Sequence, residues 1–233
     1  MNTVTLIMAY YENPTMLRKQ YENLRTLKKY RDYISVIIVD DGSPDHPAFA
    51  EDLDGMSLQI FRMQQDIRWN QDACRNIGAR EATTEWLLLT DMDHMVPSKT
   101  WGKLIQTEWD EQAILTFTRV TAPEMQVYKF HPNTWFMTKA MFDKTGGYDE
   151  RFAGYYGTDG DFRNRVKNAG LVVECQKHII RIPRELVSDA STTRYERKTD
   201  NDRINIARIK EERSLVPNWQ PLRNSFRYDR VYP

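Results

Sequence analysis

Asp91 and Asp93 follow the strongly apolar run WLLL at residues 86–89 and have one residue between them. In an extended segment, side chains two positions apart point to the same side, so both carboxylates can face one ligand. Divalent cations such as Mg²⁺ and Mn²⁺ prefer oxygen ligands and are commonly held by one or two carboxylates together with substrate phosphates. The spacing is compatible with a site for a metal ion and a diphosphate, and equally with two solvated turn residues or helix caps.

A second acidic pair ends another apolar run, in the segment VIIVDDGSPD at residues 36–45. The carboxylate of Asp40 or Asp41 could accept a hydrogen bond from the N–H group of a base ring, and the glycine that follows permits a tight turn. A turn followed by a helix that Ser43 or Asp45 caps explains the same residues without a ligand. Taken alone, the pair favours the turn and helix cap over a ligand site.

Short apolar runs rich in Val, Ile and Leu predict the strands that carry these polar residues. They occupy residues 4–8, 34–40 and 85–91. Uninterrupted runs of this kind are typical of strands buried on both faces of a parallel sheet. Between them, the pattern predicts helices within 13–32 and 71–84 and a short strand at 58–63. This alternation predicts the α/β class, with a mixed, mostly parallel central sheet flanked by helices.

The ends of the predicted strands indicate where a ligand would bind. Sheets of this class bind ligands beyond the carboxyl ends of their strands. Here those ends carry three polar clusters, at residues 9–12, 40–43 and 91–93. We therefore expect the three clusters to meet at one rim of the sheet.

The second half of the chain is less regular and ends in a polar segment. Strands are predicted at 113–120, 127–138 and 171–182, and helices at 139–147 and 159–170. From Arg194 to Arg230 the chain has ten Lys and Arg against six Asp and Glu. We expect a helix at 201–216 that packs Ile204, Ile206 and Ile209 on the domain. The alternative is that basic and aromatic residues of this segment contact an anionic acceptor such as nucleic acid.

The composition is that of a soluble globular domain. The 233 residues are 40% hydrophobic and 28% charged, with 33 Lys and Arg against 33 Asp and Glu. This balance does not favour wholesale binding to nucleic acid or membranes. Cys74 and Cys175 are too few for a disulfide framework, and no segment reaches the length of a membrane span. The apolar run at the amino terminus is too short for a signal peptide, so we expect a cytoplasmic protein.

Four motifs occur in order along the chain: VTLIMAYYENPTML (4–17), VIIVDDGSPD (36–45), RWNQDACRNIGAREATTEWLLLTDMDHMVP (68–97) and GGYDERFAGYYGTDGDFRNRVKNAG (146–170). Together they resemble the glycosyltransferases of the GT-A fold, family 2-like, with a carboxy-terminal segment like that of the galactosyltransferases. The resemblance extends from about residue 3 to about residue 190. It implies a nucleotide-sugar half at 1–97, an acceptor half at 98–190, and a helix and tail at 191–233.

The resemblance implies a role for residues at each strand end. Those near the nucleotide-sugar donor would be Ala9, Tyr10, Glu12, Asp41, Arg75, Asn76 and Asp91. Of these, Asp41 would face the base, as expected for the uracil N–H of a UDP-linked sugar. Asp93 would bind Mn²⁺ or Mg²⁺ directly, and Asp91 would approach both the ribose and the metal.

The acceptor side would be formed by the second half. Asp159 matches the carboxylate that acts as catalytic base in the family. Asp161, Trp135, Tyr155 and Tyr156 would lie near the acceptor, where sugar faces stack on aromatic rings. The resemblance therefore implies a metal-dependent, inverting transfer of a sugar to an acceptor hydroxyl, with the acceptor a glycan or, less in keeping with the family, a nucleic acid.

The sequence departs from the family pattern at two places. Thr158 stands where the family often has a glutamate. The third metal ligand is often a histidine, whereas the corresponding segment here offers Asp189, with His94 and His178 as alternatives. These departures leave two other classes open: a metal-dependent nucleotidyltransferase or phosphohydrolase, and a sugar-nucleotide-binding module without turnover.

Overall fold

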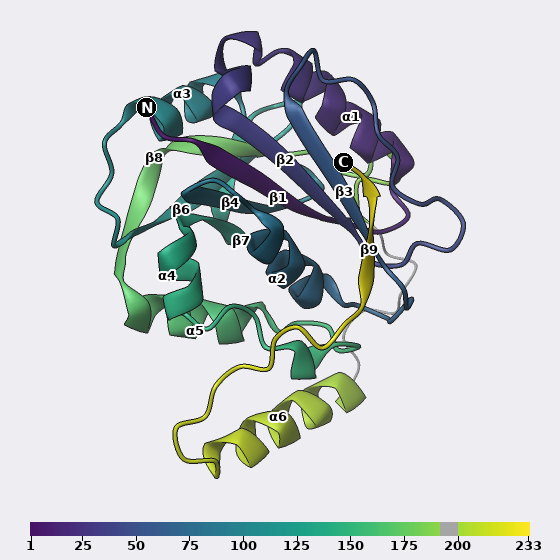
Figure 1. Ribbon diagram of the computed structural model, residues 1–233, viewed down its shortest axis with the longest axis vertical. Coiled ribbons are helices and arrows are strands. Elements are labelled where there is room, and N and C mark those ends of the chain that lie inside the picture. Colours follow the sequence, from purple (N-terminus) through teal and green to yellow (C-terminus); the bar gives the residue numbers. More distant parts are fainter. Residues whose placement is uncertain (192–199) are drawn as a thin grey trace.

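Nine strands form one mixed sheet in the computed structural model, which describes residues 1–191 and 200–233 (Figure 1). The strands are β1 (Val4–Tyr10), β2 (Ile34–Asp40), β3 (Ser57–Met63), β4 (Trp86–Asp91), β5 (His94–Met95), β6 (Ala113–Thr121), β7 (Gln126–Thr138), β8 (Leu171–Arg181) and β9 (Tyr228–Tyr232). Their order across the sheet is β5-β8-β6-β7-β4-β1-β2-β3-β9. The mixed α/β sheet flanked by helices that the sequence predicts is confirmed; among the described residues four of its strand pairs are parallel and four are antiparallel.

The helices cover both faces of this sheet. They are α1 (Pro14–Arg25), η1 (Lys28–Tyr33), α2 (Gln71–Glu81), α3 (Ser98–Gln106), α4 (Lys139–Lys144), η2 (Glu150–Phe152), α5 (Asp159–Ala169) and α6 (Asp200–Ser214). Helices α1 and α3 pack on one face, and α2, α4 and α5 pack on the other (Figure 1). None of the described helices is long and apolar enough to cross a membrane.

The apolar runs form strands because both faces of the parallel region are covered. In β4, Trp86 and Leu88 belong to the core under α1 and α3, whereas Leu87 and Leu89 belong to the core under α2, α4 and α5. Each strand residue therefore needs an apolar side chain, whichever face it points to. Strand β4 pairs in parallel with β1 and antiparallel with β7, where Leu89 faces Trp135.

The carboxy-terminal segment packs on the domain through helix α6 and strand β9 and through the stretch between them. Helix α6 buries Ile206 and Ile209 against Phe152. Ile204 is 64% exposed, so the prediction that it packs on the domain is wrong. It lies on the opposite side of α6 from that contact. Strand β9 pairs antiparallel with β3 and closes that edge of the sheet, where an unpaired strand would be exposed.

A close contact between α2 and β1 brings the helix near the site described below. Gly78 of α2 faces Ile7 of β1, and a Cβ at position 78 would overlap with the Ile7 side chain. Both residues are buried in the core on that face of the sheet. Glycine is therefore required here for close approach rather than for an unusual backbone conformation.

Gly78→Ala tests this contact. We expect the overlap with Ile7 to lower the free energy of unfolding by about 1–3 kcal/mol, as overpacking of a core does. Gly160→Ala in α5 is the matched control, because its nearest neighbour would be Arg163 Nη2 at 3.9 Å. The control should be neutral or stabilising by up to about 1 kcal/mol. Equal denaturant midpoints for Gly78→Ala and the parent chain would contradict the close packing.

Candidate active site

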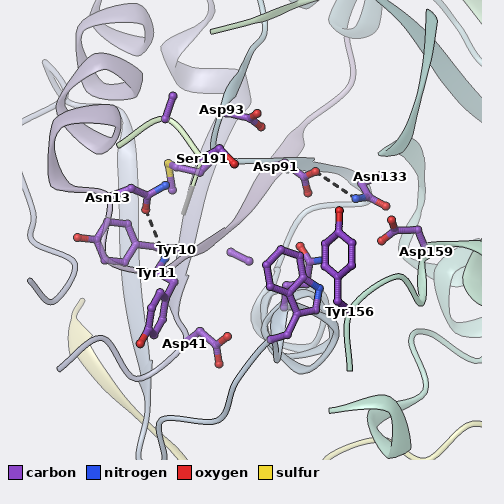
Figure 2. A pocket seen from close by; sticks show the side chains of 15 residues that line it. Tyr10, Tyr11, Asn13, Asp41, Asp91, Asp93, Asn133, Tyr156, Asp159 and Ser191 are labelled. Carbon is purple, nitrogen blue, oxygen red and sulfur yellow. Dashed lines mark hydrogen bonds between the residues drawn. The ribbon is translucent and has the colours of Figure 1, made fainter. Parts of the chain in front are cut away.

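A pocket lies beyond the carboxyl ends of β1, β2 and β4 (Figure 2). Seven of the residues predicted to act on a substrate or a metal line it together: Ala9, Tyr10, Asp41, Asp91, Asp93, Tyr156 and Asp159. The remaining lining residues are Tyr11, Asn13, Trp69, Gln71, Met92, Asn133, Ala190 and Ser191. The parallel register explains the convergence, since Ala9 pairs with Asp91 and Tyr10 with Asp40 at the same rim.

Asp41 forms one end of the pocket. Its Oδ2 accepts a hydrogen bond from the backbone N–H of Asn70 at 3.0 Å. Its Oδ1 is buried and has no hydrogen-bond partner among the described residues. Burial raises the pKa of Asp41 well above its usual value. A buried carboxyl group with one unused oxygen at a pocket can bind a ligand N–H group, which is the chemistry predicted for this residue.

Glu12 and Tyr10 hold the loop that follows β2. Glu12 has a left-handed backbone with φ of 53°, and its Oε1 accepts from the N–H groups of Asp45 and His46 at 2.7 and 2.9 Å. The Tyr10 hydroxyl donates to the His46 carbonyl at 2.6 Å. Glu12 thus shapes the predicted nucleotide pocket through this loop and is not itself one of the lining residues.

Asp91 is held by a buried arginine. The guanidinium of Arg75 is fully buried and forms an ion pair with Asp91 Oδ1, while Asp91 Oδ2 accepts from Asn133 Nδ2 at 3.1 Å. Burial by itself would raise the pKa of Asp91, but Arg75 and a hydrogen bond from His131 hold it well below its usual value. Asp91 is therefore ionised and fixed in place at the rim.

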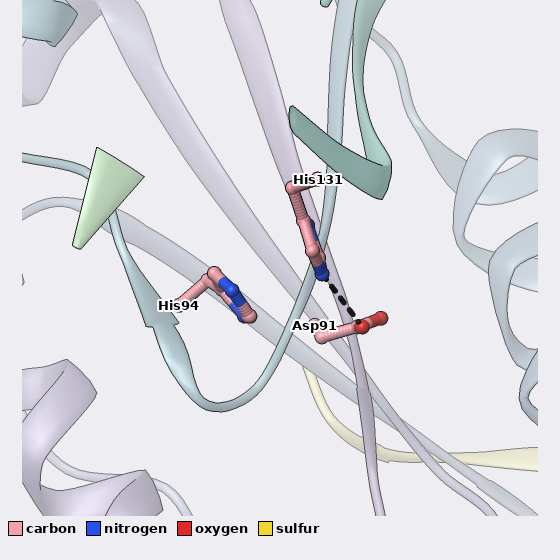
Figure 3. A group of neighbouring side chains, drawn as sticks. All are labelled: Asp91, His94 and His131. Carbon is pink, nitrogen blue, oxygen red and sulfur yellow. Dashed lines mark ion pairs between the residues drawn. The ribbon is translucent and has the colours of Figure 1, made fainter. Parts of the chain in front are cut away.

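Asp93 contacts a pair of stacked histidines behind the pocket. His94 Nδ1 lies 2.7 Å from Asp93 Oδ1, and the imidazoles of His94 and His131 stack with centroids 3.7 Å apart. Burial and the neighbouring His94 lower the pKa of His131 to about 4, so His131 is neutral near pH 7. Asp91, His94 and His131 each offer a ligand atom within 4.8 Å of one another, a grouping that could hold a metal ion (Figure 3). His131 was not predicted; a histidine inside the apolar segment 127–138 was the available signal.

Asp159 begins α5 on another wall of the pocket (Figure 2). Burial raises its pKa, an effect that Arg75 and a hydrogen bond with Asn133 partly offset. Its Oδ1 is buried and has no hydrogen-bond partner among the described residues. The side chain of Asn133 contacts both Asp91 and Asp159 and so connects the two acidic groups. Asn133 was not predicted as a site residue, although it interrupts an apolar strand sequence.

Thr158, which stands where the family motif often has a glutamate, lies beside a carboxyl group from α2. Its hydroxyl donates to Asp72 Oδ2 at 2.9 Å, which places a second carboxyl group next to the start of α5. Burial raises the pKa of Asp72 to about 6, with Arg75 acting in the opposite direction. Asp72 comes from α2, 86 residues away in the sequence, so the motif around Thr158 could not reveal it.

A family model described as glycosyl transferase family 2 matches residues 5–168. The chain belongs to glycosyl transferase family 2. The match includes the acidic residues that line the pocket, from Asp41 to Asp159. Among proteins with curated descriptions, none matches this sequence significantly.

Solved glycosyltransferases share the fold of this family 2 chain. GalNAc-T7 with UDP, GalNAc and Mn²⁺ is 14% identical, with a TM-score of 0.59 over 78% of this chain and 43% of that one. Residues 1–349 of S. aureus TarS with UDP-GlcNAc are 14% identical, with a TM-score of 0.62 over 78% and 59%. The Pyrobaculum calidifontis mannosyltransferase PcManGT with GDP-Man and Mn²⁺ is 16% identical, with a TM-score of 0.60 over 88% and 61%. These likenesses show the GT-A fold, and the chain spans 43–61% of the length of these structures.

Six residues predicted to contact substrate are not among those that line the pocket. Glu12 and Arg75 contact groups next to it, as described above, and the other four lie further away. Trp135 is 1% exposed and packs against Phe162 of α5. Asn76 binds the backbone of Tyr148 through both amide atoms. The remaining two residues face the carboxy-terminal segment. Tyr155 packs beside Phe152 and α6, and Asp161 pairs with Arg165 and Arg213.

Two aromatic rings form a further wall of the pocket. Trp69 and Tyr156 meet edge to face with centroids 4.5 Å apart. Trp69 has a left-handed backbone with φ of 58°, a conformation that a bulky residue rarely adopts. The Trp69 carbonyl accepts from the N–H group of Gly154, which ties this segment to the loop before Tyr156. Tyr156 therefore lines the pocket beside an aromatic partner.

Asp189, the residue predicted as third metal ligand, caps α1. Its two oxygens accept from the backbone N–H groups of Thr15 and Met16 at 2.6 and 2.9 Å. The residue before the helix, Asn13, makes no side-chain capping bond, so Asp189 supplies this contact from the far end of the domain. His178, one of the alternatives, is exposed on β8. The contacts of Asp189 support a structural role rather than metal binding.

Asp189→Ala separates the two roles. Loss of the cap should lower the free energy of unfolding by about 1–2 kcal/mol and leave the affinity for Mn²⁺ unchanged. Asp189→Asn keeps one acceptor oxygen, so its free energy of unfolding should fall by less than that of Asp189→Ala. Denaturation followed by circular dichroism gives the first quantity and a Mn²⁺ titration gives the second. A tenfold loss of Mn²⁺ affinity in Asp189→Ala would restore Asp189 as a ligand.

Proposed function

We propose that this chain is a metal-dependent, inverting glycosyltransferase that moves a sugar from a UDP-linked donor to an acceptor hydroxyl. The observation that carries the proposal is the placement of Asp93 and Asp159 on different walls of one pocket. Asp93 comes from the turn after β4, and Asp159 from the start of α5. Membership of glycosyl transferase family 2 supports sugar transfer as the class of reaction.

The donor nucleotide would bind at the Asp41 end of the pocket. The unused Oδ1 of Asp41 can accept the N–H group of a uracil ring. GalNAc-T7 and TarS were solved with UDP and UDP-GlcNAc, whereas PcManGT was solved with GDP-Man. A single buried acceptor suits uracil better than guanine, because guanine offers two neighbouring donors on its pairing edge.

The metal ion would be held by Asp93, with Asp91 beside it. The side chains of Asp93 and Asp91 are 17% and 24% exposed, and both residues line the pocket. Carboxylate oxygens fit Mn²⁺ and Mg²⁺, and two of the similar structures contain Mn²⁺. When bound, the ion would neutralise the charge that grows on the leaving diphosphate.

Asp159 would act as the general base. Its raised pKa makes it a better proton acceptor than an ordinary carboxylate, and its Oδ1 has no partner among the described residues. The base removes the proton from the acceptor hydroxyl as that hydroxyl attacks the sugar. Because Asp159 lies on a different wall from Asp91 and Asp93, attack opposite the leaving group gives single displacement with inversion.

Asp93→Ala tests the metal role. We expect Mn²⁺-dependent transfer to fall by more than about 100-fold, because the lost charge stabilisation amounts to several kcal/mol. Mn²⁺ binding in the presence of UDP should be lost while the melting temperature stays close to that of the parent chain. Asp32→Ala, at a side chain that is 83% exposed, is the control and should bind Mn²⁺ normally. Normal Mn²⁺ affinity in Asp93→Ala would remove Asp93 from the metal site.

Asp159→Asn tests the base. We expect kcat to fall by about 10²–10⁴-fold with little change in donor affinity, since the amide keeps the shape but cannot take a proton. In the parent chain, kcat should fall as the pH drops through the pKa of Asp159, because the protonated carboxyl group is not a base. This decrease in kcat should begin at a pH above the range in which ordinary carboxyl groups titrate, since the pKa of Asp159 is raised. A pH profile of Asp159→Asn that kept the same acidic fall would assign it to another group.

The first experiment is a thermal-shift screen of nucleotide sugars with Mn²⁺ or Mg²⁺, because a bound donor raises the melting temperature by mass action. Product analysis then separates the reaction classes. Transferred or hydrolysed sugar with released UDP supports a glycosyltransferase. Release of the sugar as its phosphate would indicate a nucleotidyltransferase or phosphohydrolase, and a melting shift without any turnover would indicate a binding module.

A further inference from the structure

We propose that His94 and His131 are positioning residues, which hold Asp93 and Asp91 by hydrogen bonds and stay outside the coordination sphere of the metal ion. The inference rests on the proposed function, because it takes these two aspartates as the carboxylates that face the metal. Both histidines are only 2% exposed and stack on each other, and Figure 3 shows them next to Asp91. Each imidazole contacts one of the two aspartates.

The contacts of His94 determine which of its nitrogens carries the proton. Its Nε2 lies 3.3 Å from Arg119 Nη1. A guanidinium can only donate hydrogen bonds, so Nε2 must be the acceptor of this pair. The proton of the neutral ring is then on Nδ1, which lies 2.7 Å from Asp93 Oδ1. His94 therefore donates to Asp93, and Arg119 fixes the tautomer that makes this possible.

The contacts of His131 lead to the opposite tautomer. Its Nε2 lies 3.3 Å from Asp91 Oδ2, and its Nδ1 lies 2.6 Å from Thr134 Oγ1. A carboxylate only accepts, so Nε2 must carry the proton and donate to Asp91. Thr134 then donates to Nδ1 and accepts in turn from Thr90, whose Oγ1 is 2.8 Å away. The chain of donors Thr90, Thr134 and His131 ends on Asp91.

These assignments leave no nitrogen lone pair for a metal ion. The lone pair of His94 faces the positive Arg119, and that of His131 faces the Thr134 hydroxyl. Binding a cation within the Asp91, His94 and His131 group would require both hydrogen bonds to break. It would also bring the cation next to the guanidinium of Arg119. The arrangement therefore favours carboxylate ligands, with the histidines behind them.

The same network explains how the carboxylates of Asp91 and Asp93 are kept apart and oriented toward the proposed metal ion. Asp91 and Asp93 each have one oxygen tied to a buried imidazole, and the stacked rings keep the two anchors at a constant separation. Mutation of a group that holds a metal ligand in this way typically lowers metal affinity by about 10–100-fold. Removal of either anchor should thus weaken the metal site without removing a ligand.

Paired substitutions test the positioning role with Mn²⁺ as the probe, in the full chain with UDP present. His131→Gln and His94→Asn place an amide donor near Nε2 and Nδ1 respectively, whereas His131→Leu and His94→Leu remove the donor. We expect the leucine variants to lose about 10–100-fold in Mn²⁺ affinity and the amide variants to retain most of it. Circular dichroism and thermal melting check that each variant is folded.

Pulsed electron paramagnetic resonance of Mn²⁺ on the unmodified chain needs no variant. We expect no coupling from a directly bound imidazole ¹⁴N. Such a coupling, or equal loss of Mn²⁺ affinity in the amide and leucine variants, would make the histidines ligands and overturn the inference. Unchanged affinity in folded leucine variants would also overturn it and leave the proposed function intact. If the unmodified chain with UDP binds no Mn²⁺, the metal-dependent function itself fails.

Discussion

The site depends on one buried cation, the guanidinium of Arg75. It is fully buried, pairs with Asp91 and Asp72, and lies 5.1 Å from the Tyr148 ring centroid. A buried charge is tolerated only when it is paired, so Arg75 and the carboxylates around it require one another. Gly78, one turn further along α2, lets the helix lie close to β1. This close packing brings Arg75 to the end of β4, next to β1 in the sheet, where Asp91 lies.

Arg75 acts unequally on the three acidic groups near it, and this gives them different properties. Asp91 receives its ion pair directly and has a pKa well below the usual range. Asp159 and Asp72 are also buried near Arg75, but for both of them burial prevails and the pKa is raised, to about 6 for Asp72. Neighbouring carboxyl groups whose pKa values are separated in this way are suited to different tasks. Asp91 is an anion that can help bind a ligand, whereas Asp159 takes up a proton more readily than an ordinary carboxylate does.

Much of this arrangement was predictable because strand ends follow directly from apolar runs. Asp41, Asp91 and Asp93 each follow a strand that is buried on both faces, so their meeting at one rim needs only the parallel topology. The role of β7 was not predictable, because it depends on strand direction and register. In β7, Asn133 and Trp135 point to the same face, and the pairing of Leu89 with Trp135 places Asn133 opposite Asp91. Trp135 lies deeper and is covered by Phe162. Of these two residues on the same face of β7, only Asn133 therefore lines the pocket.

Position at the pocket, together with hydrogen-bond partners, separates the structural acids from those available to a ligand. Glu12 and Asp189 look equally functional in the sequence, yet each binds two backbone N–H groups of the protein. Asp41 and Asp159 each have a buried oxygen without a partner among the described residues, and both line the pocket. Buried polar atoms are nearly always paired, so such oxygens require an explanation. A donor that offers an N–H group to Asp41 and an acceptor that offers a hydroxyl group to Asp159 would satisfy both oxygens, in a pocket that Asp91 and Asp93 also line.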